Sequence, residues 1–166
     1  PKKWYYSRSS KPRTLKQFTD LYYTTIGRNA AFNLGLSIGP SGRIPDADVK
    51  AMLAQKRQLD REFAMDLARE ATITASDVRG NAPSFVAEQC IDGSTRTYWA
   101  TGDGVNKASL TLDFGKPTAF NRVLLQEHIA LGQRVDSFLL EAEQGGNWTE
   151  AARGTTIGYK RVLRFA

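Results

Sequence analysis

The sequence predicts two successive folds, an α/β segment over residues 1–69 and an antiparallel β-sandwich over residues 70–166. In the first segment, apolar residues recur with the spacing of a helix face on both sides of one short alternating stretch. From Ala71 onward the period becomes that of a strand, and turn-forming residues separate the alternating stretches. Several short strands at this spacing are typical of a jelly-roll-like sandwich.

The first segment opens with an aromatic run and a predicted helix. Trp4-Tyr5-Tyr6 has the composition of a buried strand or of a platform for a sugar. Thr14 and Gln17 have the spacing of a capping box, and the helix that they begin is expected to stop at Gly27. Its predicted apolar face consists of Leu15, Phe18, Tyr22 and Ile26.

A predicted strand and a second helix complete this segment. Residues 32–38 alternate apolar with small polar side chains, and the turn Gly39-Pro40-Ser41-Gly42 ends that strand. Asp46 and Asp48 place negative charge in the first turn of a helix that is expected to reach about residue 69. Helix, strand and helix make only part of an α/β fold, whereas a complete (β/α)8 barrel takes about 250 residues. Residues 1–69 are therefore expected to be the end of a barrel whose body precedes Pro1.

The sandwich is predicted to form around residues 90–115. Asp92-Gly93 supplies a turn with positive φ at the glycine, and residues 97–101 are a β-favouring run with half-buried rings. Residues 109–114 alternate as a strand. Further strands are predicted at residues 121–127, 137–143 and 153–165.

Three side chains of the sandwich are expected to be buried. Trp99 and Trp148 each lie in a motif of the sandwich and beside a turn, and both are predicted core anchors. Cys90 is expected to pack as a small hydrophobe. As the single cysteine it excludes an internal disulfide.

The charge distribution argues against nucleic-acid binding, although the net charge is +6. Residues 1–69 hold 13 Lys and Arg against 6 Asp and Glu, a net charge of +7, and residues 70–166 hold 10 against 11. The basic residues are scattered among acidic ones and do not form a groove with interleaved aromatic rings. No run of about 18 apolar residues is present, so no membrane partner is expected either.

The sandwich also carries the motifs of a known family. DG, TYWAT, SLTLDFGKP, FNRVLLQE and GQRV follow one another between Asp92 and Val135. In this order they resemble the discoidin-like domain, also called the coagulation factor V/VIII type C domain, over residues 71–166. The resemblance implies that the strand closing the sandwich would follow Ala166, so that the domain is incomplete.

A second resemblance concerns residues 20–49. The positions that carry it are Asn33, Leu34, Leu36, Ile38, Gly39, Pro40, Gly42 and Ile44. They resemble the last strand, and the turn after it, in the catalytic barrel of glycoside hydrolase family 29 α-L-fucosidases. Ser37 stands where many members have a second asparagine. Together the resemblances imply a fucosidase fragment truncated at both ends, with the end of the barrel joined to a discoidin-like module.

The implied chemistry is the removal of terminal α-L-fucose from glycans by an exo-acting, retaining enzyme. This reaction uses two carboxyl groups about 5 Å apart, and in the family they lie on earlier barrel strands. No catalytic residue is therefore expected in this chain, which should be inactive alone. No cofactor is required for catalysis, and the resemblance implies a periplasmic or secreted location. The carboxylates expected to be only helix-start, loop or surface charges are Asp46, Asp48, Asp103, Glu127 and Glu141.

Candidate binding residues follow from the same resemblance. On the barrel side, Trp4 and Tyr5 are candidates to stack on fucose, with core packing as the alternative. At the Asp92-Gly93 turn the resemblance implies a structural calcium held by Asp92 and Thr97 alongside backbone carbonyls. Ser94 replaces an acidic residue that is frequent there, and the resemblance places further ligands in the strand expected after Ala166. The loop residues that are candidates for sugar binding by the module are Arg79, Asn81, Phe85, His128 and Arg134.

The alternative function is a non-catalytic carbohydrate-binding or adhesion module. The strand end at Gly39-Pro40 and its flanking helices favour the enzyme. An independent adhesin would have no use for part of a barrel.

Overall fold

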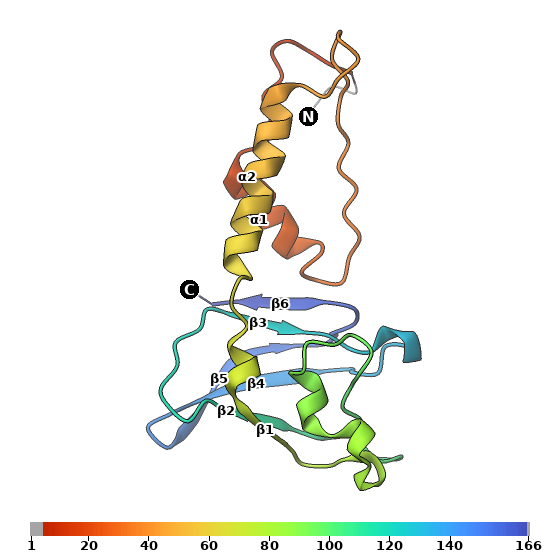
Figure 1. The fold of residues 1–166 in the computed structure, drawn as a ribbon, viewed down its shortest axis with the longest axis vertical. Coiled ribbons are helices and arrows are strands. Elements are labelled where there is room, and N and C mark those ends of the chain that lie inside the picture. The colour runs from red at the N-terminus through yellow and green to blue at the C-terminus, as the bar shows by residue number, and fades with distance from the viewer. Residues whose placement is uncertain (1–4, 166) are drawn as a thin grey trace. The chain divides into compact units, whose positions relative to one another are not determined.

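A computed structural model of the chain describes residues 5–165 (Figure 1). The chain divides into two compact units, one ending at Met65 and one beginning at Asp66. Residues 66–69, which the sequence placed at the end of a helix, belong to the second unit. Trp4, a candidate for substrate contact, lies outside the described residues. Within them, no helix has the length and apolar character needed to cross a bilayer.

The helix α1 (Leu15–Thr24) begins with the predicted capping box. The Thr14 hydroxyl accepts the backbone N–H of Gln17 at 3.3 Å, and the Gln17 side chain accepts the backbone N–H of Thr14 at 2.9 Å. The helix ends before Gly27, where the sequence placed its stop. Near this end the Thr25 hydroxyl donates to the Leu21 carbonyl at 2.6 Å. Such a local side-chain bond offers the backbone an alternative to a further helical turn.

The helix α2 (Asp46–Glu62) has acidic residues in its first turn, as predicted. It ends at Glu62 and not near residue 69. The Asp66 carboxylate accepts the N–H of Ala68 at 3.2 Å and caps a separate 3-10 turn, η1 (Leu67–Glu70). Because this side-chain bond begins a separate turn at Asp66, the residues that follow do not continue α2.

The two helices pack on each other through aromatic residues. Phe18 and Tyr23 of α1 are buried, and the Tyr23 hydroxyl donates to Glu62 of α2 at 2.5 Å. The rings of Tyr22 and Phe63 lie 6.1 Å apart, centre to centre. Burial of the Phe18 and Tyr23 side chains stabilises the packing of the first unit.

The predicted strand at residues 32–38 is extended but pairs with no residue that the structure describes. No other described segment of this unit is a strand, so this backbone has no partner here, and the barrel strand stays a prediction. Ile38 is 55% exposed. The turn that follows is as predicted: Gly39 N–H donates to the Arg43 carbonyl at 2.8 Å, and Gly42 has a φ of 73°.

The second unit contains three antiparallel strand pairs, and the sandwich predicted for it is confirmed (Figure 1). The strands β2, β3 and β4 confirm those predicted at residues 109–114, 121–127 and 137–143. Ile73, Ala87 and Val162 are buried in this unit. The pairs are β1 (Thr72–Ala75) with β2 (Leu110–Asp113), β3 (Arg122–Leu125) with β6 (Arg161–Arg164), and β4 (Phe138–Gln144) with β5 (Asn147–Gly154).

The predicted last strand, residues 153–165, is wrong in its extent. The chain turns back at Gly145 and Gly146, whose φ values are 60° and 84°, so that β5 already begins at Asn147. At Gly154 the strand ends beside the Phe138 ring, where a Cβ would lie 2.7 Å from the ring carbons. Only after a further turn does β6 follow.

Two of the three expected core residues are exposed. Trp99 is half-buried, and its Nε1–H donates to the Asp77 carbonyl at 2.8 Å. Trp148 is 58% exposed and lies opposite Glu143 in the β4–β5 hairpin. Its position beside a turn was a poor guide because the register of the hairpin decides which face a side chain occupies. Cys90 is exposed as well.

Candidate functional site

Three rings from distant parts of the sequence meet in the second unit. Tyr98 lies 5.5 Å from Phe85 in a tilted arrangement and 4.5 Å from His128 in a stacked one, measured between ring centres. All three side chains are half-buried, so each still reaches solvent. We call Phe85, Tyr98 and His128 the ring cluster. Partly exposed rings of this kind are common in the lining of ligand sites.

Backbone hydrogen bonds hold two sides of the ring cluster together. The short 3-10 turn η3 (Pro83–Phe85) ends at Phe85, whose carbonyl accepts the Ala100 N–H at 3.3 Å. The Ala100 carbonyl accepts the Arg79 N–H at 2.8 Å, and the Asp77 carboxylate accepts the Gly102 N–H at 2.7 Å. Residues 97–101 therefore form no strand, contrary to their composition, because their backbone bonds to this loop.

The third side of the ring cluster depends on Glu127. Its carboxylate accepts the backbone N–H groups of Arg134, Val135 and Gly158 at 2.6, 2.8 and 2.5 Å. The loop between Glu127 and Arg134 is thus closed at both ends by one side chain, and His128 lies at its start. The sequence treated Glu127 as a loop or surface charge. The structure shows that it is the acceptor that fixes this loop.

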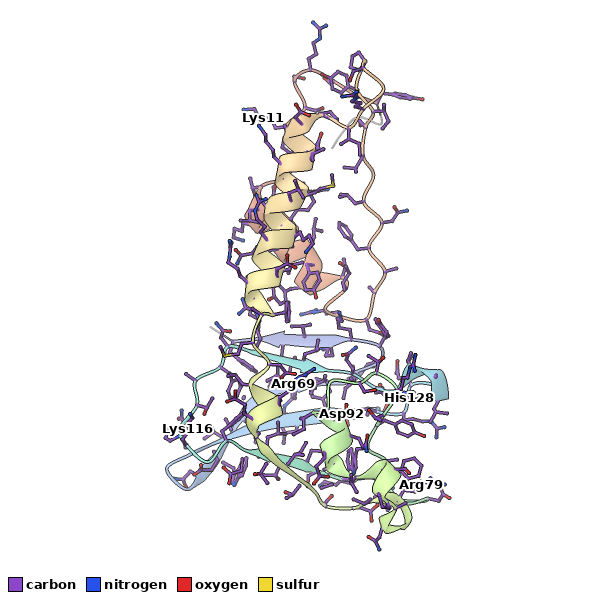
Figure 2. All side chains as sticks on the ribbon, viewed as in Figure 1. Lys11, Arg69, Arg79, Asp92, Lys116 and His128 are labelled. Carbon is purple, nitrogen blue, oxygen red and sulfur yellow. The ribbon has the colours of Figure 1, made fainter. Side chains whose placement is uncertain are left out.

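The predicted sugar ligand Arg79 is held by an acidic partner. Its guanidinium donates to both carboxylate oxygens of Asp103, at 2.7 and 3.0 Å. These hydrogen bonds and the charge of Asp103 raise the pKa of Arg79. Both side chains are exposed, so the pair is available to solvent but adds little stability. Figure 2 shows Arg79 and His128 on the same side of this view of the second unit.

The remaining predicted ligands lie on the same loops. Asn81 is exposed and has a φ of 51°, in the turn η2 (Arg79–Asn81). Arg134 is exposed, and its Nε–H donates to the Leu131 carbonyl at 3.2 Å. The structure thus brings Phe85 and His128 together around Tyr98. Tyr98 was not among the predicted site residues, because residues 97–101 were interpreted only as a β-favouring run with half-buried rings.

In the first unit, Tyr5 is 86% exposed and lies in no strand. Three of the carboxylates that were predicted to be helix-start or loop charges have those positions in the structure. Asp46 and Asp48 lie in the first turn of α2. Asp103 pairs with Arg79.

The expected calcium ligands are bonded to each other. The Thr97 hydroxyl donates to Asp92 Oδ2 at 2.6 Å, and the Ser94 N–H donates to Oδ1 at 2.7 Å. These two bonds, together with the nearby Arg69 guanidinium, lower the pKa of Asp92. Gly93 has a φ of 79°, so the predicted turn is confirmed. In residues 5–165, no three His, Cys, Asp or Glu side chains gather where they could hold a metal.

Comparisons with known proteins agree on one family and one class of enzyme. The sequence profile of the F5/8 type C domain matches residues 72–163. Alpha-L-fucosidase 1 of Arabidopsis thaliana is 34% identical over 165 residues, which cover 98% of this chain and 33% of that protein. The chain therefore spans about a third of the length of that curated relative.

Solved structures similar to the chain include a fucosidase and a separate sugar-binding module. A Ruminococcus gnavus GH29 fucosidase in complex with fucose superposes with a TM-score of 0.91 at 30% identity, over 98% of this chain and 33% of that one. A chitosan-binding module from a chitosanase/glucanase of Paenibacillus sp. IK-5 superposes with a TM-score of 0.52 at 28% identity, over 61% of this chain and 76% of that one.

Proposed function

This chain belongs to the F5/8 type C domain family through residues 72–163, and we propose that it is the C-terminal part of an exo-acting α-L-fucosidase. The main support for this proposal is the similarity of sequence and structure to α-L-fucosidases. It extends over 98% of the chain and thus includes the first unit, which lies outside the F5/8 type C match.

In this proposal residues 1–69 are the last elements of a (β/α)8 barrel, and residues 70–166 are the sandwich attached to it. The extended stretch at residues 32–38 supports the assignment. Its backbone has no strand partner in the described chain, and Ile38 is more than half exposed. Neighbouring strands of a barrel would pair with this backbone and cover such a side chain.

The proposed reaction is the hydrolysis of terminal α-L-fucose from glycans with net retention. It requires a nucleophilic carboxylate and a second carboxyl group as acid and base, about 5 Å apart, and no cofactor. We assign both groups to the part of the barrel outside this chain. Glu127 and Asp103 support this, because their oxygens are occupied by backbone N–H groups and by Arg79. The proposed location is periplasmic or secreted.

Hydrolysis of a chromogenic α-L-fucoside tests this proposal. The full-length protein and the 166-residue chain are assayed side by side, with the corresponding β-D-galactoside as a control for sugar specificity. Release of the chromophore from the fucoside by the full-length protein alone is the expected result. No release by the full-length protein would contradict the fucosidase assignment, and release by the short chain would place the carboxylates within it.

A second function, sugar binding by the sandwich itself, is favoured by the ring cluster. Three half-buried rings on loops provide an apolar platform, and Arg79, Asn81 and Arg134 supply donors on the same loops. The likeness to a chitosan-binding module supports a carbohydrate ligand. In this reading the sandwich holds a glycan while the barrel removes its fucose.

Calorimetric titration with fucosylated oligosaccharides tests the binding function. Tyr98→Leu removes the central ring, and about a tenfold loss of affinity is expected if that ring stacks on sugar. Tyr159→Leu is the matched control, because Tyr159 is an exposed tyrosine outside the ring cluster. Equal affinity of the Tyr98 variant and the unaltered protein would argue that the rings only pack against one another.

A further inference from the structure

The Asp92-Gly93 turn is where the resemblance implied a calcium ion, and the side-chain oxygens that the described residues offer there do not make a calcium site. Calcium takes about six to eight oxygen ligands in proteins. At this turn Asp92 is the single acidic residue among residues 90–97, and both of its oxygens already accept hydrogen bonds. Ser94 turns its own hydroxyl oxygen to the N–H of Arg96 at 3.1 Å.

A positive group already lies against this turn. A Cβ on Gly93 would overlap the guanidinium of Arg69, so the glycine leaves the space that the guanidinium fills. The positive φ of Gly93 is a second reason for glycine at this position. Figure 2 shows Arg69 and Asp92 as neighbours in the second unit.

The Arg69 side chain is anchored on its own side as well. Its Nε–H donates to Asp66 Oδ2 at 3.3 Å, and the other oxygen of Asp66 caps the turn η1 that carries Arg69. The guanidinium therefore lies between Asp66 and the Asp92 turn. A divalent cation bound beside Asp92 would be repelled by the positive charge of the guanidinium.

We propose that the Arg69 guanidinium takes the place of the structural calcium at the Asp92-Gly93 turn, which therefore holds its conformation without a divalent cation. Arginine suits this position because its flat fork lies against the glycine backbone and keeps its charge at any physiological pH. The chain replaces an exchangeable ion with a side chain from the preceding turn η1. The inference does not depend on the proposed enzyme activity.

Hydrogen exchange in the full-length protein tests the inference locally. The peptide over residues 91–98 contains the Ser94 and Arg96 amides that donate within the turn. Its exchange is measured in the unaltered protein with excess calcium and with a chelator, and equal rates are expected. Slower exchange in calcium that is lost in Asp92→Asn would overturn the inference.

The second arm removes the guanidinium. Arg69→Met should speed exchange of the 91–98 peptide several-fold in the presence of the chelator, and Arg69→Lys should restore part of the protection. Arg153→Met is the matched control, since Arg153 is also an exposed arginine paired three residues away, with Glu150, but lies on β5. If Arg69→Met changes this peptide no more than Arg153→Met does, Arg69 has no such role. Should the Met variant fail to fold, Arg69→Gln, which also lacks the charge, takes its place in this arm, and the calcium comparison still tests whether the turn holds its conformation without the ion.

Discussion

Tyr98 illustrates what a single side chain contributes to the candidate site. Its ring contacts both Phe85 and His128, which do not contact each other through any described ring pair. Removing Tyr98 would therefore separate the two predicted ligands from each other. A half-buried aromatic ring can pack against the core through one face and contact a ligand through its exposed edge.

Cys90 leads to a prediction at the same scale. The residue is exposed, but the protein atoms around its thiol raise the pKa, and the Asp92 carboxylate adds to the shift by opposing a second negative charge. The thiol should thus stay protonated at neutral pH. We expect slow alkylation by iodoacetamide at neutral pH and a rate that rises with pH through the raised pKa.

Mass spectrometry of the labelled protein over a series of pH values measures this rate. Protein unfolded in guanidinium chloride is the control, because unfolding removes the surroundings that shift the pKa. It should react faster than folded protein at neutral pH. Equal rates for folded and unfolded protein would show that the surroundings of Cys90 do not protect it.

At the scale of elements, Glu127 joins three segments of the sandwich. It lies two residues after the end of β3 and closes the loop that contains the turn η5 (Ile129–Leu131). It also accepts the N–H of Gly158, which precedes β6. The backbone of Glu127 also donates to the Gly158 carbonyl at 2.9 Å. Because β3 and β6 pair with each other, one residue sets both the end of this sheet and the position of the His128 loop.

Glu127→Ala is expected to loosen this loop selectively. It leaves three backbone N–H groups without their acceptor, which should lower the free energy of local opening by about 2 kcal/mol. Glu127→Gln keeps one acceptor oxygen and should fall between the Ala variant and the unaltered protein. Hydrogen exchange of residues 128–135 in the full-length protein measures the effect.

Glu141→Gln provides the comparison for this series. Glu141 is an exposed glutamate on β4, and changing it should leave exchange of the 128–135 loop as it was. If Glu127→Ala leaves the loop as protected as Glu141→Gln does, the three hydrogen bonds do not determine its order.

At the scale of the whole molecule, both units expose large apolar side chains. In the first unit these include Leu36 and Ile38, on the extended stretch without a strand partner. In the second they include Leu139, Trp148 and Tyr159. Exposed apolar residues beside unpaired backbone favour association with other chains.

We therefore expect the isolated 166-residue chain to self-associate and to unfold without a sharp transition. Size-exclusion chromatography with light scattering measures the first property, and thermal unfolding followed by circular dichroism measures the second. Replacing Leu36 and Ile38 with serine should reduce association, because it removes apolar surface from the unpaired stretch. A monodisperse monomer with a cooperative melt would contradict this expectation.

The sequence by itself determined the features that depend on neighbouring residues. The capping box joins Thr14 to Gln17, and the turn at Asp92-Gly93 needs only a glycine that can adopt positive φ. The strands β2, β3 and β4 were also predictable, because the alternation of apolar and polar residues is a local property of a half-buried strand. Family motifs, read in order along the sandwich, were sufficient to predict the family itself.

Tertiary structure alone decided which distant residues meet. Tyr98 joins Phe85 and His128, and Glu127 bonds to a residue 31 positions away; no local pattern encodes either contact. The exposure of Trp148 follows from hairpin register, and the lack of a strand at residues 32–38 follows from the lack of a partner. A strand and a side chain's direction are both properties of a pairing, whereas a cap or a turn is complete within a few residues.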